Sequence, residues 1–147
     1  MKKVYWAVIA LIFILPIAYY LISPLFIDIE LNEASPLGTQ AETISKTMLT
    51  GDFIPSAHEV SGKALILDAP EGKVLRFEDF ETVNGPDLFI YLSSDLTNDD
   101  FIDLGEIKAT KGNVNYILPE NIDLEKYNKV LVWCRAFRVL FSYAKLK

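Results

Sequence analysis

Residues 4–27 form one apolar run, VYWAVIALIFILPIAYYLISPLFI, that contains no charged side chain. A helix that spans a bilayer needs about 20 apolar residues, and this run is long enough even if the helix is tilted. Lys2 and Lys3 precede the run, and Asp28 follows it. Because basic residues flank the end of a span that stays in the cytoplasm, the sequence predicts a single-pass protein of the cell membrane, with its N-terminus inside.

A cleaved signal peptide is the competing interpretation of the same residues. Its apolar region usually has about 7–15 residues and ends at a cleavage site of small residues, whereas this run is longer and YYLISPL contains no Ala-x-Ala pattern. We therefore expect an uncleaved signal anchor. The predicted organisation is a cytoplasmic tail (1–3), a transmembrane anchor (4–27), a tether that lifts the domain off the membrane (28–50) and an extracytoplasmic β-domain at the cell surface (51–147).

Short β-type runs separated by turn residues fill the chain after Gly51. Runs at this spacing, without long helices between them, indicate an antiparallel β-sandwich or barrel. The predicted fold class is therefore all-β with about seven to nine strands, preceded by one N-terminal transmembrane helix. Residues 88–92 and 130–134 are apolar at successive positions, which favours central strands buried on both faces.

Turn residues also predict which strands are neighbours. PEG (70–72), KG (111–112) and RA (135–136) each lie between two β-type runs and predict three hairpins. The last run, FRVLFSYAKL, alternates apolar and polar residues. That pattern places Phe137, Val139, Phe141 and Tyr143 on one face of the strand.

Composition excludes several functions. The chain has 14 basic and 20 acidic residues, and this acidic balance disfavours a nucleic-acid partner. With one histidine, His58, and one cysteine, Cys134, the chain alone lacks the ligands for blue copper, structural zinc or an iron–sulfur cluster. No Cys-x-x-Cys-His motif for c-type haem is present, and no serine lies in the glycine pattern of a nucleophile elbow, so a hydrolase is disfavoured. We expect no metal site.

The acidic segment SSDLTNDDFIDLG (93–105) carries five carboxylate or amide side chains. It lacks the glycine and the terminal glutamate of an EF-hand calcium loop. The sequence therefore favours a solvated acidic loop over a calcium site.

Cys134 and His58 remain as candidate functional residues. Free cysteines are usually small buried apolar residues, whereas an unpaired cysteine in an exported protein indicates reactivity or intermolecular pairing. A reactive thiol needs exposure and a nearby positive charge. Arg135 is adjacent to Cys134, but on an extended strand its side chain points to the opposite face. His58 is either an ordinary structural histidine or a partner of Cys134, and the spacing does not decide between these roles.

Four motif-bearing segments, taken in order, resemble the DM-thirteen domain family, the electron-transfer-type module of Skeletor-like cell-surface proteins. The resemblance runs from about Gly51 to Leu146 and is carried by Gly51-x-Phe53 with His58-x-x-x-Gly62, Phe80 with Gly85-Pro86-Asp87-Leu88 and Tyr91-Leu92, Leu104-Gly105 with Gly112-x-x-x-Tyr116, and Trp133-Cys134 with Phe137, Val139, Phe141 and Ala144.

The resemblance implies an extracytoplasmic β-domain in which Cys134 acts in redox chemistry. Cys134 would be either a naked thiol or an axial ligand to a prosthetic group such as haem, with His58 as a further cofactor-binding candidate. A haem would need a cavity lined by aromatic residues such as Trp133, Phe137 and Phe141. A naked thiol would cycle through a sulfenic acid or through a mixed disulfide with a redox partner protein. The alternative function is a non-catalytic binding or interaction domain that presents the loops 84–87 and 93–103. A buried, unreactive Cys134 favours that alternative.

Overall fold

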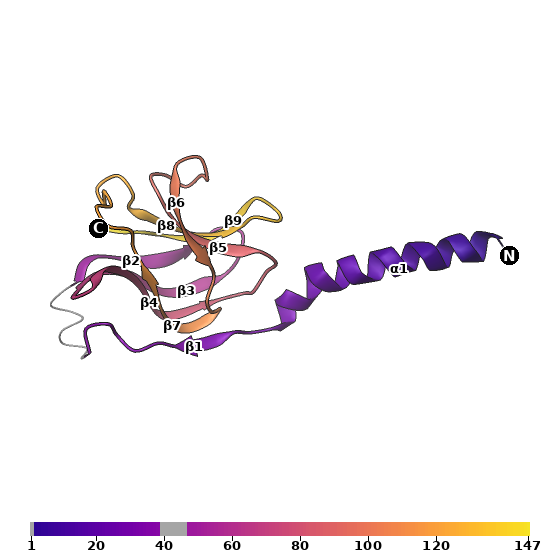
Figure 1. Cartoon of the computed structure of the whole chain (residues 1–147), viewed down its shortest axis with the longest axis horizontal. Coiled ribbons are helices and arrows are strands. Elements are labelled where there is room, and N and C mark those ends of the chain that lie inside the picture. The colour runs from indigo at the N-terminus through magenta and orange to yellow at the C-terminus, as the bar shows by residue number, and fades with distance from the viewer. Residues whose placement is uncertain (1, 39–46) are drawn as a thin grey trace.

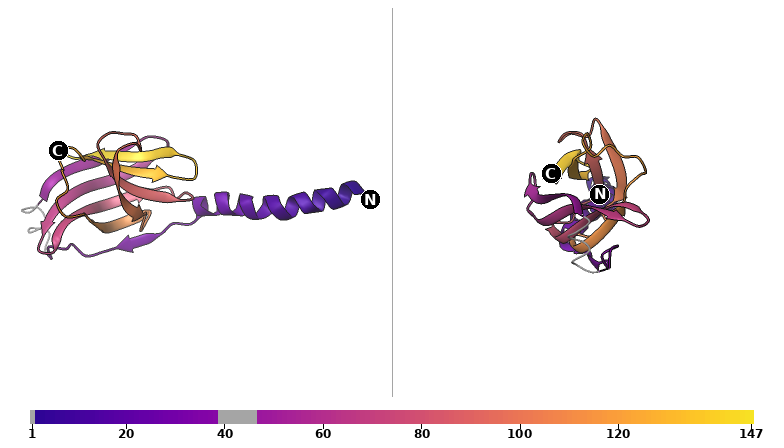
Figure 2. Two further views of the ribbon diagram at one scale, coloured as in Figure 1. Left: turned by 45° about the horizontal axis from the view of Figure 1, so that its top comes forward. Right: turned by 90° about the vertical axis from the view of Figure 1, so that its left-hand side faces the viewer.

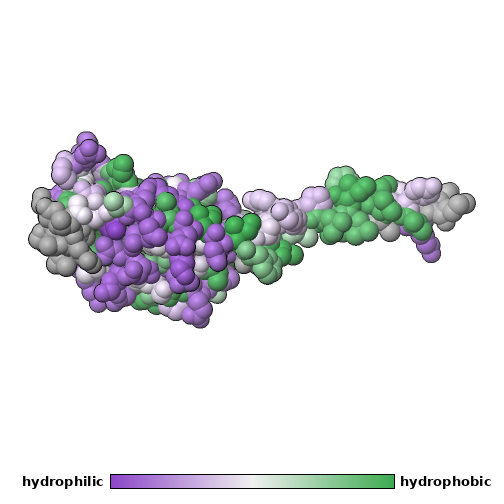
Figure 3. Space-filling model, turned by 90° about the horizontal axis from the view of Figure 1, so that it is seen from below, coloured by the Kyte–Doolittle hydropathy of each residue, from purple (hydrophilic) through white to green (hydrophobic). Residues whose placement is uncertain are grey.

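The computed structural model describes residues 2–38 and 47–147 (Figure 1). One helix, α1 (Lys2–Ile22), is followed by a short 3-10 helix, η1 (Ser23–Phe26). Residues 3–22 have a mean hydropathy of 2.2, and none of the most apolar part is buried against the domain. The exposed surface of α1 is mostly apolar, whereas the adjoining face of the domain is mostly hydrophilic (Figure 3). The helix is long and apolar enough to cross a membrane.

Nine strands follow the helices and form one sheet. The bounds of the strands are β1 (Glu30–Asn32), β2 (Thr47–Pro55), β3 (Val60–Ala69), β4 (Gly72–Thr82), β5 (Leu88–Ser93), β6 (Phe101–Glu106), β7 (Lys111–Ile117), β8 (Lys129–Cys134) and β9 (Val139–Lys145). Their order across the sheet is β1-β7-β4-β3-β2-β9-β8-β5-β6. All pairs are antiparallel except β1 with β7. The predicted all-β fold with one N-terminal apolar helix is confirmed.

The sheet curls into a half-barrel because β2 belongs to both of its halves (Figures 1 and 2). The first part of β2 pairs with β3, and its last three residues, from Phe53 to Pro55, pair with β9. At Gly51, where β2 changes partner, a Cβ atom would collide with the carbonyl oxygen of Lys145. A glycine therefore permits the close approach of the two halves at this bend.

Buried apolar side chains form two clusters. The larger one, which we call the inner cluster, lies between the two halves of the sheet and includes Phe77, Phe80, Val132 and Cys134. We call the smaller one the outer cluster; it covers the opposite face of β5, β6, β8 and β9. It consists of Tyr91, Leu131 and Trp133, with Phe89, Leu96, Phe101, Leu140 and Tyr143 packed against them. Strands β5 and β8 are therefore covered on both faces, as their apolar sequences predict.

Two of the three predicted hairpins are present, and the prediction of the third is wrong. Strand β3 pairs with β4 through the turn at 70–71, and β8 pairs with β9. The KG pair does not form a turn, because Lys111 and Gly112 are the first residues of β7. Strand β6 pairs with β5, and β7 crosses to the other half of the sheet to pair with β4.

The predicted alternation along the last strand is also wrong. Between β8 and β9 the register shifts, so that Val132 lies opposite Ser142 but Trp133 lies opposite Leu140. Phe141 is therefore the extra residue of a β-bulge. The bulge directs Phe141 into the inner cluster, whereas Tyr143 joins the outer one.

The segment expected as a tether, residues 28–50, contributes to the sheet at both ends. Residues 30–32 form β1 on the edge of β7, and β2 begins at Thr47. The carbonyl of Ile27 accepts a hydrogen bond from Asn84, and Ile29 exchanges hydrogen bonds with Thr110. The beginning of the segment is thus part of the domain, and residues 39–46 lie outside the described residues.

Candidate functional site

Cys134 is the last residue of β8, opposite Leu88 on one neighbouring strand and Val139 on the other. Its side chain has no exposed surface and lies in the inner cluster. The Sγ atom donates a hydrogen bond to the carbonyl oxygen of Pro86 at 3.1 Å. The sulfur is therefore enclosed by core side chains and hydrogen-bonded to one backbone acceptor.

The loop of residues 83–87, between β4 and β5, supplies that acceptor and is itself well anchored. Asn84 accepts a hydrogen bond from Gly85 N and donates one to Ile27 O, both at 2.8 Å. The ring of Phe141 lies against Gly85, where a Cβ atom would be 2.8 Å from it. At the other end of the loop, Asp87 O accepts a hydrogen bond from Arg135 N at 3.0 Å. The loop is thus fixed on both sides of the residue that contacts the thiol.

His58 lies after the end of β2, half-buried, and its contacts are with Phe141. Its ring centroid is 4.0 Å from that of Phe141, and its backbone N–H donates to Phe141 O. Among the described residues, no hydrogen bond links His58 to Cys134. Phe141 thus contacts both His58 and the loop above the thiol, but the two candidate residues do not form a hydrogen-bonded pair.

Arg135 points away from Cys134, as the sequence predicts. Its guanidinium carbon lies 3.3 Å from the centroid of the Phe89 ring, and Nε donates to the hydroxyl of Tyr91 at 2.5 Å. Nη2 forms an ion pair with Asp103. This positive charge belongs to the outer face, so it does not lie beside the thiol.

The aromatic residues proposed as a haem pocket do not converge on Cys134. Trp133 lies in the outer cluster, Phe141 in the inner one, and Phe137 is 54% exposed in the turn between β8 and β9. A thiolate ligand would also lose the hydrogen bond that the thiol donates to Pro86. The residues around Cys134 do not fit a haem in this conformation.

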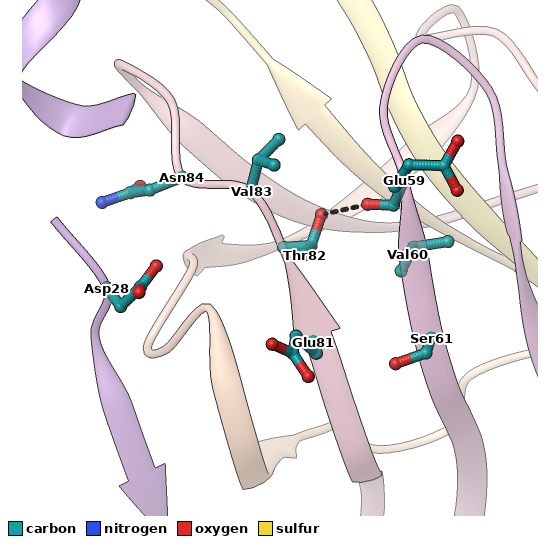
Figure 4. A pocket seen from close by; sticks show the side chains of 8 residues that line it. All are labelled: Asp28, Glu59, Val60, Ser61, Glu81, Thr82, Val83 and Asn84. Atoms are coloured by element: carbon teal, nitrogen blue, oxygen red, sulfur yellow. Dashed lines mark hydrogen bonds between the residues drawn. The ribbon is translucent and has the colours of Figure 1, made fainter. Parts of the chain in front are cut away.

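Two surface pockets of about 390 Å³ each lie on the domain, and Cys134 lines neither of them. One lies between β3, β4 and the chain that follows η1 (Figure 4). Asp28, Glu59 and Glu81 contribute carboxylates to its lining, and Thr82 donates a hydrogen bond to Glu59 O across it. In the described part of the chain, no three histidine, cysteine or carboxylate side chains are grouped closely enough to hold a metal ion.

Carboxylates of the acidic loop bond to their neighbours. Thr97 donates backbone and side-chain hydrogen bonds to Asp95, and these bonds lower the pKa of Asp95. The side chains of Lys126 and Tyr127 bond to Asp100 and lower the pKa of that carboxyl too. These contacts stabilise the loop and connect it to residues 126–127.

The outer cluster is the feature that sequence reasoning missed. The rings of Tyr91 and Phe101 stack at 4.0 Å, and Arg135 closes one edge of the cluster. The signal was present in the sequence, because β5 and β8 carry large apolar residues at successive positions. Only the register shows which of these residues share a face.

The fold and site define a class: an all-β domain with one buried thiol, attached to a helix of membrane-spanning length. A family model described as electron transfer DM13 matches residues 52–146. The chain belongs to this family. No curated protein and no solved structure matches the chain. Membership supports a redox role without identifying a partner.

Proposed function

We propose that this protein is a single-pass membrane protein of the electron-transfer type whose redox-active group is the thiol of Cys134. Residues 1–3 are its cytoplasmic tail, residues 4–27 its anchor, and the β-domain that follows, with β1 and all of β2 included, lies on the extracytoplasmic side. The family match supports the redox role, and the uncharged run behind Lys2 and Lys3 supports the orientation.

The contact between Cys134 Sγ and Pro86 O is the observation that carries the proposal. It places the thiol at the end of a strand, beneath one loop rather than in the middle of the sheet. Although hydrogen bonds anchor this loop at both ends, opening it locally breaks fewer contacts than unfolding the core strands does. Movement of residues 83–87 would expose the sulfur without unfolding the domain.

The exposed thiol would then exchange with a disulfide of a partner protein. Cys134 loses its proton to water, and its thiolate attacks one sulfur of the partner's disulfide. A mixed disulfide forms, and the partner's second sulfur leaves as a thiolate. Cys134 is thereby oxidised and the leaving sulfur reduced. Because the chain has no second cysteine, a thiol reductant from outside both proteins must attack the sulfur of Cys134, which releases the partner as a dithiol. A second equivalent of that reductant then releases Cys134 as a thiol and forms the disulfide of the reductant, so that two electrons have passed to the partner.

Thiol exchange in the full chain, solubilised in detergent, tests this mechanism. The folded protein should react with an aromatic disulfide reagent more slowly than free cysteine does, but much faster than the domain unfolds. Asn84→Ala removes the hydrogen bonds to Ile27 and Gly85, so it should accelerate the reaction at least several-fold. Asn128→Ala, which removes an exposed amide bond to Glu125 O, is the control and should leave the rate unchanged.

A non-catalytic binding domain is the second candidate function, and the complete burial of Cys134 favours it. In that case Cys134 is a core residue, and loops such as 84–87 and 93–103 bind a ligand. The thiol would then react only at the rate of global unfolding, in both the parent protein and Asn84→Ala. That result would exclude the redox mechanism and leave the binding domain.

A further inference from the structure

The turn between β8 and β9, residues 135–138, presents an exposed aromatic ring beside an unpaired cation. Phe137 is 54% exposed, and the neighbouring Arg138 is exposed too. Among the described residues, the guanidinium of Arg138 has no hydrogen bond or ion pair, and only its backbone N–H donates, to Arg135 O. The side chain of Arg135, in contrast, is bound to Tyr91 and Asp103. Single exposed apolar residues are common and need no explanation. This turn is distinguished from other exposed residues by its position in the fold.

The turn lies at the end of the domain from which α1 leaves. The loop 83–87 connects the two, because Asn84 bonds to Ile27 O beside the helices and Asp87 O bonds to Arg135 N in the turn. Both views in which the whole chain is seen from the side place the β8–β9 hairpin at this end (Figures 1 and 2). If α1 crosses a bilayer, the turn faces the surface of that bilayer.

The connection between η1 and the sheet is short. Only residues 27–29 separate Phe26 from β1, and three extended residues span at most about 10 Å. Ile29 N donates to Thr110 Oγ1 at 2.9 Å, and Thr110 N donates to Ile29 O at 2.8 Å. The domain therefore stays next to the membrane instead of being raised above it by a free tether.

We propose that the turn 135–138 docks on the bilayer beside α1, with Phe137 at headgroup level and Arg138 paired with the phosphates of anionic lipids. Aromatic rings favour this interfacial zone, and each cation at an anionic surface strengthens such a contact by about fivefold. The acidic pocket with Asp28, Glu59 and Glu81 includes the chain that follows η1. Because anionic lipids repel these carboxylates, the domain would contact the bilayer through the β8–β9 hairpin.

This inference rests on the membrane anchoring proposed above, and the experiment separates the two. The full chain with Cys134→Ala is reconstituted in nanodiscs that contain anionic phospholipid, and an environment-sensitive fluorophore is attached at one introduced cysteine. Ala136→Cys probes the turn, because Ala136 is exposed and its replacement leaves Phe137 and Arg138 in place. Phe13→Cys probes the middle of α1. Ile117→Cys is the matched control, because Ile117 is 79% exposed but lies at the far end of β7, which runs away from the anchor parallel to β1.

Lipids spin-labelled at the headgroup or on the acyl chain then quench each fluorophore according to its depth. The proposal predicts quenching at 136 by the headgroup label, quenching at 13 by the acyl-chain label and none at 117. Quenching at 13 without quenching at 136, or equal quenching at 136 and 117, would overturn the docking and leave the anchor intact. No quenching at 13 would overturn the anchoring and, with it, the docking.

A charge reversal tests the part of the proposal that concerns Arg138. In the background labelled at 136, Arg138→Glu should lower the ratio of docked to undocked turn at least fivefold in anionic nanodiscs. Arg138→Lys should retain docking. Lys63→Glu makes the same change in net charge at an exposed position on β3 and should have little effect. Equal losses in Arg138→Glu and Lys63→Glu would overturn the specific role of the turn.

Discussion

Two buried serine hydroxyls differ in whether they form a hydrogen bond. Ser142 Oγ is buried without a hydrogen-bond partner, the one such side-chain atom in the described part of the chain. Ser93 Oγ is equally buried but donates to the carbonyl oxygens of Thr97 and Asp100. An unsatisfied buried polar group costs about 1–3 kcal/mol, so the same substitution should have opposite effects at the two positions.

We expect Ser142→Ala to raise the free energy of unfolding by about 1 kcal/mol and Ser93→Ala to lower it by about 1–3 kcal/mol. Urea unfolding of both variants in one buffer measures the difference. A loss of stability in Ser142→Ala as large as that in Ser93→Ala would mean that a buried water satisfies the Ser142 hydroxyl.

Tyr116 makes stability depend on alkaline pH. Burial raises the pKa of its phenol from 10.0 to about 12, and its hydroxyl accepts a hydrogen bond from Lys108 N. Because the neutral phenol is favoured in the folded state, its contribution is complete below pH 10 and is lost as pH rises through 12. The loss can reach about 3 kcal/mol.

Urea unfolding at several values between about pH 9 and pH 12 checks this effect of Tyr116. Tyr116→Phe should cost about 1 kcal/mol near neutral pH, because Lys108 N loses its acceptor. The variant should then lose less stability than the parent protein between pH 10 and 12. Parallel pH profiles for the two proteins would contradict the assignment to Tyr116.

At the scale of elements, β1 depends on a glycine in the strand beside it. Gly112 has a φ of 113°, and a Cβ atom there would collide with the carbonyl oxygen of Leu31 in β1. Gly72 has a similar φ of 124°, but a Cβ atom there would have no neighbour within 4 Å. Alanine at either position adds backbone strain of about 1–3 kcal/mol, and only Gly112→Ala also displaces β1.

Hydrogen exchange of the Ile29 and Glu33 amides reports on β1, because these groups bond to Thr110 and Asn113. Both amides should lose protection in Gly112→Ala and keep it in Gly72→Ala. Equal protection in the two variants would mean that strain alone accounts for the effect of the Gly112 substitution.

The sequence predicts elements well where one local rule decides them. The PEG turn and the apolar runs of β5 and β8 follow from turn chemistry and from burial on both faces. The hairpin predicted at the KG pair is wrong because β7 pairs with a distant strand. A glycine inside a strand gives the same local signal as a glycine in a turn. The alternation of β9 fails at Phe141 because nothing in a single strand reveals a bulge, which depends on the register with its partner.

The same division applies to the candidate site. Composition limits the chemistry to one thiol and one histidine, and the extended strand correctly directs Arg135 away from Cys134. Burial of the thiol beneath Pro86 arises from the loop 83–87, which is held by contacts to β8 and to the chain near Ile27. These contacts join residues far apart in the sequence, so local patterns do not predict them.

At the scale of the whole molecule, β1 covers one edge of the curled sheet. Removing β1 together with the residues that follow it would expose the backbone groups of β7, which can pair with another copy of the chain. It would also remove two acceptors of Arg76, which is only 6% exposed and bonds to Glu33 O and Ala34 O. A free sheet edge and a partly unpaired buried cation both favour self-association.

We therefore expect a chain that begins at residue 28 to be monomeric and a chain that begins at residue 47 to self-associate. Both lack α1, so the apolar helix does not contribute to the difference. Sedimentation velocity at several protein concentrations measures it, and a peptide of residues 28–38 should return the shorter chain to the monomer by occupying the edge of β7. If the shorter chain is monomeric and as stable as the longer one, β1 does not protect the sheet, and its role is limited to holding the domain close to the anchor.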